Sequence, residues 1–400
     1  MSWTTGFDIN TVSEIRTDSR VFLGVGAIKQ IDFIVEELKK RGVTTILVVS
    51  GRSAYQKTGA WGFVQAAFEK HGMKHVLYNK VSANPETHMV DEAVAMGKEA
   101  GANAVLAIGG GSPLDAGKSA AILLANPEKN CTQLFKFEFV PEKAVPFVAI
   151  NLTHGTGSEG NRFAVVTIPE ENYKPAIGYD CIYPMYSIDD PALMVSLPPD
   201  QSVYVSVDAV NHVTEAATST CYNPLAVTLG CEVVSLVATY LPKVMANPSD
   251  LEARYYLAYA ALIAGVGFDN GLLHYTHALE HPLSGLKSQV THGLGLAVLL
   301  PSVIREIYPA RAQILAKLYA PIVPGLKGEP SEAEAAAEGT LKWLHSIGVK
   351  EKLHDLGFKK EDVEKMVDLA FTTPSLAGLL GCAPTKATRE VVKRIYETSF

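Results

Sequence analysis

The sequence has few charged residues and lacks a long basic run. Asp, Glu, Lys and Arg make up 19% of the 400 residues, and the formal net charge is −7. Proteins that bind nucleic acid or an anionic membrane surface through charge carry clustered lysine and arginine. We therefore expect neither nucleic acid nor a membrane surface as a partner.

Cysteine is also scarce, and no two cysteines form a CxxC pair. An odd number of widely spaced cysteines argues against a disulfide framework and against a cysteine-based zinc site. We interpret them as reduced packing residues of a cytoplasmic protein. They are Cys131, Cys181, Cys221, Cys231 and Cys382.

Long apolar runs are missing as well. No segment reaches the roughly 18 to 20 consecutive apolar residues that span a bilayer. The first residues, MSWTTGFDINTVSEIR, lack the apolar core of a signal peptide. We expect no membrane span and a cytoplasmic location. With 48% hydrophobic residues, the chain is globular and long enough for two domains.

The first half of the chain alternates short, apolar, β-branched runs with helical segments. Strands are expected at 20–23, 45–50, 74–78, 104–108 and 145–150, and helices at 28–41, 61–71 and 87–100. Buried runs that alternate with helices indicate a parallel sheet covered by helices. Residues 1–191 are therefore predicted to form an α/β domain of the Rossmann-like, dinucleotide-binding type.

After Pro191 the pattern changes to long helical segments. Helices are expected at 203–219, 224–245, 251–268, 271–281 and 292–307, and the remainder also reads as helix and loop. Residues 192–400 are therefore predicted to form an all-helical domain. An α/β domain beside a helical domain leaves a cleft, which is a common place for a ligand site.

A glycine-rich stretch follows the strand expected at 104–108 and opens a helix. It begins with Gly109, Gly110, Gly111 and Ser112, and Asp115 follows. Consecutive glycines let the backbone approach an anion closely, and a helix N-terminus offers free N–H groups. The stretch matches neither GxGxxG nor GxxxxGK[ST], so a plain tight turn is the alternative. We favour a loop that binds a pyrophosphate.

Two further loops follow strands of the same predicted sheet. His154 to Glu159, which includes Thr156, is rich in Gly, Ser and Thr and could hold the other end of a dinucleotide, although a surface turn would look similar. Gly51, Arg52 and Ser53 stand where an acidic residue would bind the 2′-hydroxyl of NAD. Arginine and serine suit a 2′-phosphate instead, which favours NADP(H); an exposed loop arginine is the alternative.

Histidines gather in residues 271–293. This stretch holds His274, His277, His281 and His292, and the expected helix over 271–281 places the first three on one face. Imidazole and carboxylate ligands suit iron or zinc. The alternative, histidines that merely pack, would need a partner for every buried imidazole.

A carboxylate and an imidazole lie upstream of the histidine stretch. Asp208 and His212 are four residues apart and therefore share one helix face. We predict one divalent metal held by this pair and two of the four later histidines. The spacing does not decide which two.

At these residues the sequence resembles the iron-containing (group III) alcohol dehydrogenases, over essentially the whole chain. The shared motifs are Asn84-Pro85, GGGSPLDAGK at 109–118, GTGSE at 155–159, DPALMVSLP at 190–198, DAVNH at 208–212, HALEHPLSG at 277–285 and HG at 292–293. The Gly51-Arg52-Ser53 loop is similar to that of the NADP-linked branch typified by thermophile enzymes. The resemblance implies a dehydroquinate synthase-like fold, with an α/β domain beside an all-helical metal domain.

The resemblance also implies roles for single residues. The family's metal ligands fall on Asp208, His212, His277 and His292, and its extra histidine beside the metal falls on His281. His274 matches no ligand. The cofactor contacts implied are Gly110, Gly111 and Ser112 with Asp115 and Lys118 in the next turn, Thr153, and Lys174 at the nicotinamide-side ribose.

Three features depart from the family pattern. Asn151-Leu152-Thr153-His154 stands where the family often has Pro-Thr-Thr-Ala, and Ser206 stands where a glycine usually precedes the aspartate ligand by two residues. The segment from His281 to His292 is one residue longer than in several members. These departures concern cofactor contacts and pocket shape, and the ligand set is complete.

The activity implied is reversible hydride transfer between a primary alcohol and NAD(P)⁺. Fe²⁺ is expected, although Zn²⁺ or another divalent ion fits the same ligands, and NADP(H) is favoured over NAD(H). His281 is expected to relay the proton. The alternatives are a polyol or 1,3-propanediol dehydrogenase, a hydroxyacid–oxoacid transhydrogenase, and a binding protein without turnover. The expected partners are a small alcohol or aldehyde and further copies of the chain, as a homodimer or larger homo-oligomer.

Overall fold

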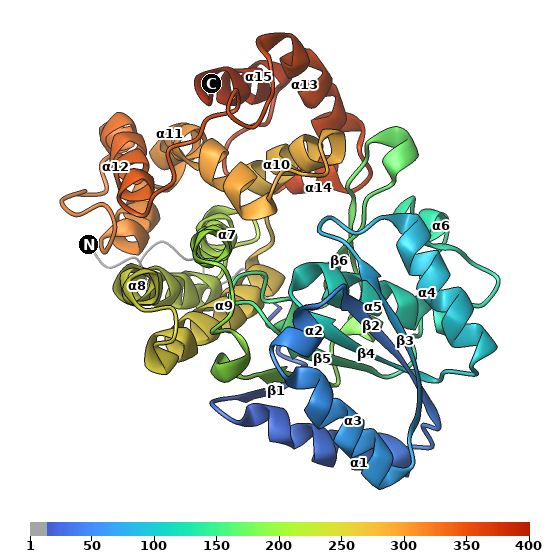
Figure 1. The fold of residues 1–400 in the computed structure, drawn as a ribbon. Coiled ribbons are helices and arrows are strands. Elements are labelled where there is room, and N and C mark those ends of the chain that lie inside the picture. Colours follow the sequence, from blue (N-terminus) through green and yellow to red (C-terminus); the bar gives the residue numbers. More distant parts are fainter. Residues whose placement is uncertain (1–13) are drawn as a thin grey trace.

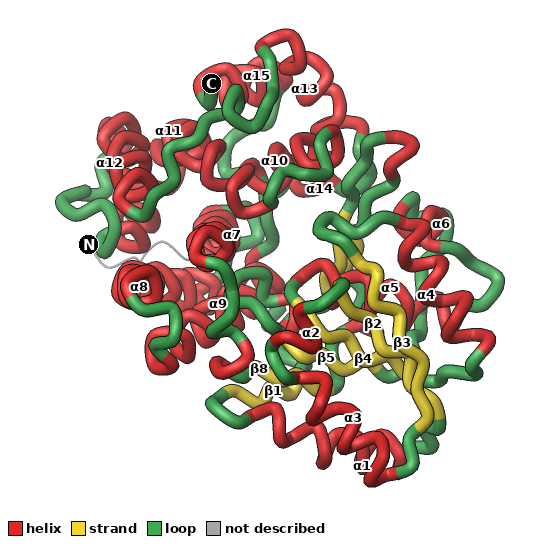
Figure 2. The backbone as a smooth tube through the Cα atoms, viewed as in Figure 1, coloured by secondary structure: helices red, strands yellow, loops and turns green. Residues whose placement is uncertain are grey.

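The structure is a computed structural model that describes residues 14–400. Strands gather in one half of the molecule, and the other half is built from helices (Figure 1, Figure 2). The predicted Rossmann-like parallel sheet, followed by a helical half, is confirmed. The predicted lack of a signal core concerns mainly residues 1–13, which lie outside the described part of the chain.

A six-stranded, fully parallel sheet forms the first half, in the order β1-β8-β5-β4-β2-β3. Its strands are β1 Arg20–Leu23, β2 Thr45–Gly51, β3 Lys74–Val81, β4 Ala104–Gly109, β5 Phe147–Asn151 and β8 Tyr186–Asp189. β8 was not predicted, because only two of its four residues are strongly apolar. It is nevertheless buried throughout, since it lies between β1 and β5.

Helices cover both faces of this sheet. They are α1 Ile31–Lys40, α2 Ala54–Lys57, α3 Ala60–His71, α4 Thr87–Glu99, α5 Gly111–Ala125 and α6 Cys131–Phe135. Along β2, Ile46 and Val48 join one core cluster, whereas Leu47 and Val49 join the other. This alternation is the period of two that a strand imposes on its side chains. A short antiparallel pair, β6 Phe163–Val165 and β7 Ala176–Gly178, follows.

The second half is helical and is arranged around α7. Its helices are α7 Pro199–Thr218, α8 Pro224–Ala246, α9 Leu251–Gly271, α10 Tyr275–Leu286, α11 His292–Tyr319, α12 Ala333–Ser346, α13 Val363–Thr372, α14 Leu376–Gly381 and α15 Arg389–Thr398. Every residue of α7 from Ser206 to Thr218 is buried, because other helices pack around it. The polar side chains of α7 therefore lie inside the protein, where each needs a partner.

The helix expected over 271–281 begins later than predicted. Gly271 ends α9, Leu272 adopts a left-handed backbone with φ of 61°, and His274 caps α10 from outside the helix. The chain bends by 107° between α9 and α10. His274 therefore does not share a helical face with His277 and His281, which corrects that prediction.

Two of the described helices, α8 and α11, are long and apolar enough to cross a membrane by length and composition alone. Neither helix contains an unbroken apolar run long enough to span a bilayer, so the expectation of no membrane span did not include them. In the structure, α8 contributes Val233 and Val237 and α11 contributes Leu299 and Val303 to one core cluster. Packing between the helices thus accounts for much of their apolar content.

Candidate metal and cofactor site

A cavity of about 640 Å³ lies where the two halves meet. One wall is formed by loops at the carboxyl ends of the strands, including Gly51 and Gly111. The opposite wall is formed by helical residues that include His212, His281 and His292. The volume is typical of a site for a small molecule or cofactor.

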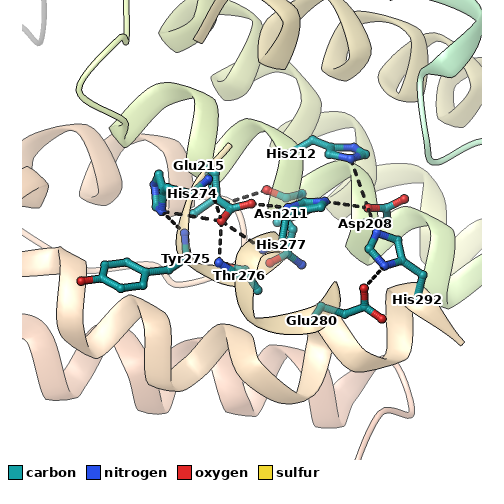
Figure 3. A network of polar contacts seen from close by, with 12 residues as sticks. Asp208, Asn211, His212, Glu215, His274, Tyr275, Thr276, His277, Glu280 and His292 are labelled. Carbon is teal, nitrogen blue, oxygen red and sulfur yellow. Dashed lines mark hydrogen bonds and ion pairs between the residues drawn. The ribbon is translucent and has the colours of Figure 1, made fainter. Parts of the chain in front are cut away.

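Three imidazole nitrogens converge on one oxygen of Asp208 (Figure 3). The Nε2 atoms of His212, His277 and His292 lie 3.3, 3.5 and 3.9 Å from Asp208 Oδ1. Ligand atoms about 2.0 to 2.2 Å from one tetrahedral metal ion lie about 3.3 to 3.6 Å apart. Asp208, His277 and His292 are spaced as ligands of a single divalent ion could be, and His212 Nε2 approaches Asp208 Oδ1 from the same side without joining that compact group.

Two of these facing atoms lack a hydrogen-bond partner among the described residues. Asp208 Oδ1 and His277 Nε2 are both buried and unpaired. Burial alone would favour the neutral carboxyl group, but the neighbouring imidazoles hold the pKa of Asp208 well below its usual value. Burial lowers the pKa of His277, but Glu215 and Asp208 outweigh it and raise that pKa to about 9, so a proton shared with Asp208 occupies the place that a metal ion would take. The residues present therefore fit a metal ion.

Glu215 orients His277 from behind. One carboxylate oxygen accepts a hydrogen bond from His277 Nδ1, and the other accepts from the backbone N–H of Thr276 at 2.5 Å. Burial raises the pKa of Glu215, but His277 and the backbone donors outweigh it and lower that pKa to about 2. Because Nδ1 donates to Glu215, Nε2 is the nitrogen that would present its lone pair to a bound metal.

Glu215 was not identified from the sequence, although a signal was available. It follows Asp208 by seven residues on α7 and therefore lies on the same helix face. It also sits at the N-terminus of α10, where a carboxylate is favoured by the free N–H groups. One residue thus fixes both the start of α10 and the orientation of a candidate ligand.

Glu280 orients His292 in the same way, through a hydrogen bond to His292 Nδ1. Lys174 Nζ lies 3.4 Å from Glu280 Oε2 and 2.8 Å from Ser284 Oγ, and it also borders the cavity. The lysine implied at the cofactor ribose is therefore tied to the residues that surround the candidate metal. The carboxylate of Glu280 needs this cation and this imidazole because it is completely buried.

His281 borders the cavity beside the candidate ligands. Its Nδ1 lies 2.8 Å from the carbonyl oxygen of Lys174. A carbonyl only accepts hydrogen bonds, so Nδ1 is the donor and Nε2 keeps its lone pair. Burial and the charge of Lys174 hold the pKa of His281 well below its usual value, so the ring is neutral.

A second group of donors, Glu280, His281 and His292, also lies close enough together for an ion. In this group, however, Glu280 and His292 already pair with each other, and Lys174 adds a positive charge. The group around Asp208 has unpaired donor atoms instead. The group of Asp208, His277 and His292, with His212 Nε2 3.3 Å from Asp208 Oδ1, is therefore the better candidate.

The glycine loop packs against the loop that follows β5. An added Cβ would lie 2.7 Å from Thr153 Cγ2 at Gly110, and 2.7 Å from Thr156 Cγ2 at Gly111. Only glycine leaves room for this contact, because real Cβ atoms do not approach so closely. Both loops border the cavity, as does Ser112, and Gly111 begins α5 with its free N–H groups.

Asp115 and Lys118 differ in their relation to the cavity. Asp115 borders it, yet its carboxylate accepts hydrogen bonds from Ser158 Oγ at 2.8 Å and Val165 N at 3.0 Å, and burial raises its pKa to about 6. Lys118 does not line the cavity. Its buried ammonium donates to Ser158 Oγ at 2.9 Å and to Phe163 O at 2.8 Å. In the structure Lys118 therefore holds the neighbouring segment together, from the helix turn that follows the phosphate loop.

The end of β2 also reaches the cavity. Gly51 borders it, and Arg52 follows as an exposed side chain. Ser53 stands at the N-cap position of the short helix α2. An arginine at this place is free to meet an anionic group that extends from the cavity.

Comparison with known proteins gives matches over nearly the whole chain. A model of iron-containing alcohol dehydrogenases matches residues 18–191, and a model of the C-terminal part of Fe-containing alcohol dehydrogenases matches residues 202–400. Long-chain primary alcohol dehydrogenase AdhA of Thermoanaerobacter ethanolicus is 53% identical over 398 residues, which cover 100% of both chains. The 1,3-propanediol dehydrogenase of Klebsiella pneumoniae is 31% identical over 90% of this chain and 92% of its own. The crystal structure of NADH-dependent butanol dehydrogenase A from Thermotoga maritima superposes with a TM-score of 0.88 at 28% identity, covering 98% of each chain.

Proposed function

The chain belongs to the iron-containing alcohol dehydrogenase family, and from this premise we propose that it interconverts primary alcohols and aldehydes with NADP(H). The observation that carries the proposal is the convergence of three imidazole nitrogens on Asp208 Oδ1, at one wall of a cavity whose other wall is a glycine loop. This arrangement supports a metal site and a cofactor site in one cavity. Hydride transfer needs these two groups side by side.

The residues have three roles: some would hold the metal, some orient its ligands, and one transfers a proton. Asp208, His212, His277 and His292 would hold Fe²⁺ or another divalent ion. When bound, such an ion is a Lewis acid that lowers the pKa of an alcohol, and the nicotinamide is the hydride acceptor. Glu215 and Glu280 keep two of the imidazoles in the ligating orientation. His281 accepts the proton at Nε2, because its Nδ1 already donates to a carbonyl.

Apolar side chains favour an alkyl substrate over a polyol. Phe268, Leu272, Leu273 and Leu379 border the cavity, and the ring of Phe268 stacks on His212 with centroids 4.5 Å apart. A polyol would leave hydroxyl groups against these side chains without partners, which costs binding energy. The relative from Thermoanaerobacter, which acts on long-chain primary alcohols by its name, supports the same choice.

A substrate screen tests the proposal. With aldehydes of increasing chain length, the absorbance of NADPH should fall as the cofactor is oxidised. This rate should exceed the rate at which the absorbance rises with glycerol or diols and NADP⁺. Turnover of 4-hydroxybutyrate with an oxoacid, and without added cofactor, would instead identify a transhydrogenase. Cofactor binding without any absorbance change would identify a binding protein.

The preference for NADP(H) is proposed from the end of β2. Gly51→Asp should shift the ratio of kcat/KM values toward NAD(H) by about tenfold or more, because hydrogen bonds to charged groups contribute roughly 1.5 to 3 kcal/mol. The new carboxylate repels a 2′-phosphate and accepts from a 2′-hydroxyl. The side chain has room, since an added Cβ meets only Val81 O, at 3.4 Å.

Gln56→Asp is the matched control, because it adds the same charge on an exposed position of α2 that does not border the cavity. It should leave the cofactor ratio unchanged. Parallel kinetics with NAD⁺ and NADP⁺ make the measurement. An unshifted ratio in Gly51→Asp would refute the 2′-phosphate argument.

The assembly state and the location stay predictions from the sequence. We propose a homodimer or larger homo-oligomer in the cytoplasm. The molar mass of the purified protein in solution, measured by light scattering, tests the first statement.

A further inference from the structure

We propose that His154 is a positioning residue that fixes the cofactor loop to the helix that carries the candidate metal ligands. The cofactor loop is defined here as residues 152–157, between β5 and the 3₁₀ turn Ser158–Gly160. The inference rests on the proposed function, because positioning matters only if cofactor and metal act together. It concerns His154, Arg254 and Ser206, which have no part in the ligand set.

His154 and Ser206 are neighbours in the folded protein. His154 lies in the cofactor loop, and Ser206 lies on α7. Although 52 positions apart, the two side chains meet, with His154 Nδ1 3.4 Å from Ser206 Oγ. Both are buried. These two side chains thus form one contact between the cofactor loop and α7.

Arg254 determines which ring nitrogen of His154 carries the proton. This arginine of α9 is completely buried, and its Nη1 lies 2.8 Å from His154 Nε2 and 2.8 Å from Ser202 Oγ. Among the described residues no carboxylate forms an ion pair with it, so neutral acceptors must satisfy its donors. A guanidinium only donates, and His154 Nε2 must therefore accept.

The proton of His154 consequently sits on Nδ1 and points to Ser206. Burial and then the charge of Arg254 lower the pKa of His154 to about 3, which agrees with a neutral ring. The chain of donors runs from Arg254 through His154 to Ser206. It joins α9, the cofactor loop and α7.

The cofactor loop packs tightly against α7 at Gly155. An added Cβ at Gly155 would lie 2.5 Å from Val205 Cβ, so the loop lies directly on α7. Thr153 and Thr156 contact the glycine loop and border the cavity, whereas His154 points to Arg254. Since Asp208 is on the same rigid helix as Val205, the anchor sets the separation between the cofactor loop and the candidate metal. A misplacement of about 1 Å can cost about 100-fold in rate.

His154→Ala tests the proposal against His154→Gln. In the alanine variant we expect unchanged metal content, an NADPH dissociation constant raised about tenfold, and kcat lowered about 10- to 100-fold. The glutamine variant should restore most of both values, because its carbonyl accepts from Arg254 and its amide donates to Ser206. Metal analysis, cofactor titration by nicotinamide fluorescence, and kinetics provide the readouts.

Leu344→Ala is the matched control for lost stability. Leu344 is buried in α12 and does not border the cavity, so its removal should lower the unfolding temperature without changing the dissociation constant or kcat. If His154→Ala behaves like this control, His154 is merely structural and the proposal is overturned.

Ser206→Ala decides the question if His154→Ala does not fold. It keeps the partner of Arg254 and removes only the acceptor on α7, so it should weaken cofactor binding in the same direction by a smaller factor. No change would overturn the proposal. The wild-type protein distinguishes this inference from the proposed function. If the wild-type protein does not turn over alcohols, the proposed function is refuted. If the wild-type protein is active and the variants behave like it, only the role of His154 is refuted.

Discussion

His277→Ala should abolish stoichiometric metal binding and lower kcat at least about 10³-fold, while NADP(H) still binds. His277 Nε2 is one of the donors around Asp208 Oδ1, and its loss removes a candidate ligand from the set of four. Lewis-acid assistance is worth several kcal/mol, and each 1.36 kcal/mol is tenfold in rate. The glycine loop and the loop after β5 also border the cavity, and neither contains His277.

The variant should still fold. Glu215 loses its imidazole partner, but it keeps the backbone N–H of Thr276 at 2.5 Å. His354→Ala, which removes an exposed imidazole, is the control and should behave as wild type. Metal analysis by mass spectrometry, together with cofactor titration, gives the comparison. Full metal content in His277→Ala would show that the ligand assignment is wrong.

Gly111→Val should give the opposite result, with metal retained and NADP(H) binding weakened at least about 100-fold. An added Cβ at Gly111 would lie 2.7 Å from Thr156 Cγ2, so the glycine loop and the cofactor loop must move apart. Overpacking of this kind typically costs 1 to 3 kcal/mol, and the displaced N–H groups at the start of α5 lose their alignment with a phosphate. Fluorescence titration with NADPH measures the change.

Gly62→Val is the matched control, because nothing lies within 4 Å of an added Cβ on that exposed residue of α3. It should leave both metal and cofactor binding unchanged. Unaltered NADPH affinity in Gly111→Val would contradict the assignment of the glycine loop to the cofactor. Together with His277→Ala, this variant separates the two walls of the cavity by experiment.

Much of the fold follows from the periodicity of the sequence. Runs such as Thr45–Gly51 are apolar and β-branched, and they alternate with helices, which is sufficient to predict a parallel sheet. β8 escapes prediction because Ser187 and Asp189 interrupt its apolar character. Its burial comes from its place between β1 and β5, which no local pattern contains.

The candidate metal site was predictable only in part. The spacing of Asp208 and His212 indicates one helix face, and the same argument extends to Glu215. The position of His292 depends on tertiary structure. Gly293 lies so close to α7 that an added Cβ would come within 2.2 Å of Tyr204 O, and this contact brings the start of α11 beside Asp208.

The resemblance to the family, and not helix geometry, selected His277 and His292 among the four histidines. It did not explain the departures at His154 and Ser206. Their contact joins segments that are far apart in the chain, so it becomes visible only in the folded protein. The tautomer of His154 likewise depends on Arg254, a residue without any motif of its own.

Titration of the metal-free protein with Fe²⁺ tests the central claim most directly. The chain is stripped with a chelator, its fold is checked by circular dichroism, and Fe²⁺ is added without oxygen while alcohol oxidation by NADP⁺ is followed. Activity should rise in proportion to bound iron and stop at one ion per chain, because Asp208 and the three imidazoles form one site. Full activity of the stripped protein, or iron binding that leaves the rate unchanged, would contradict the account.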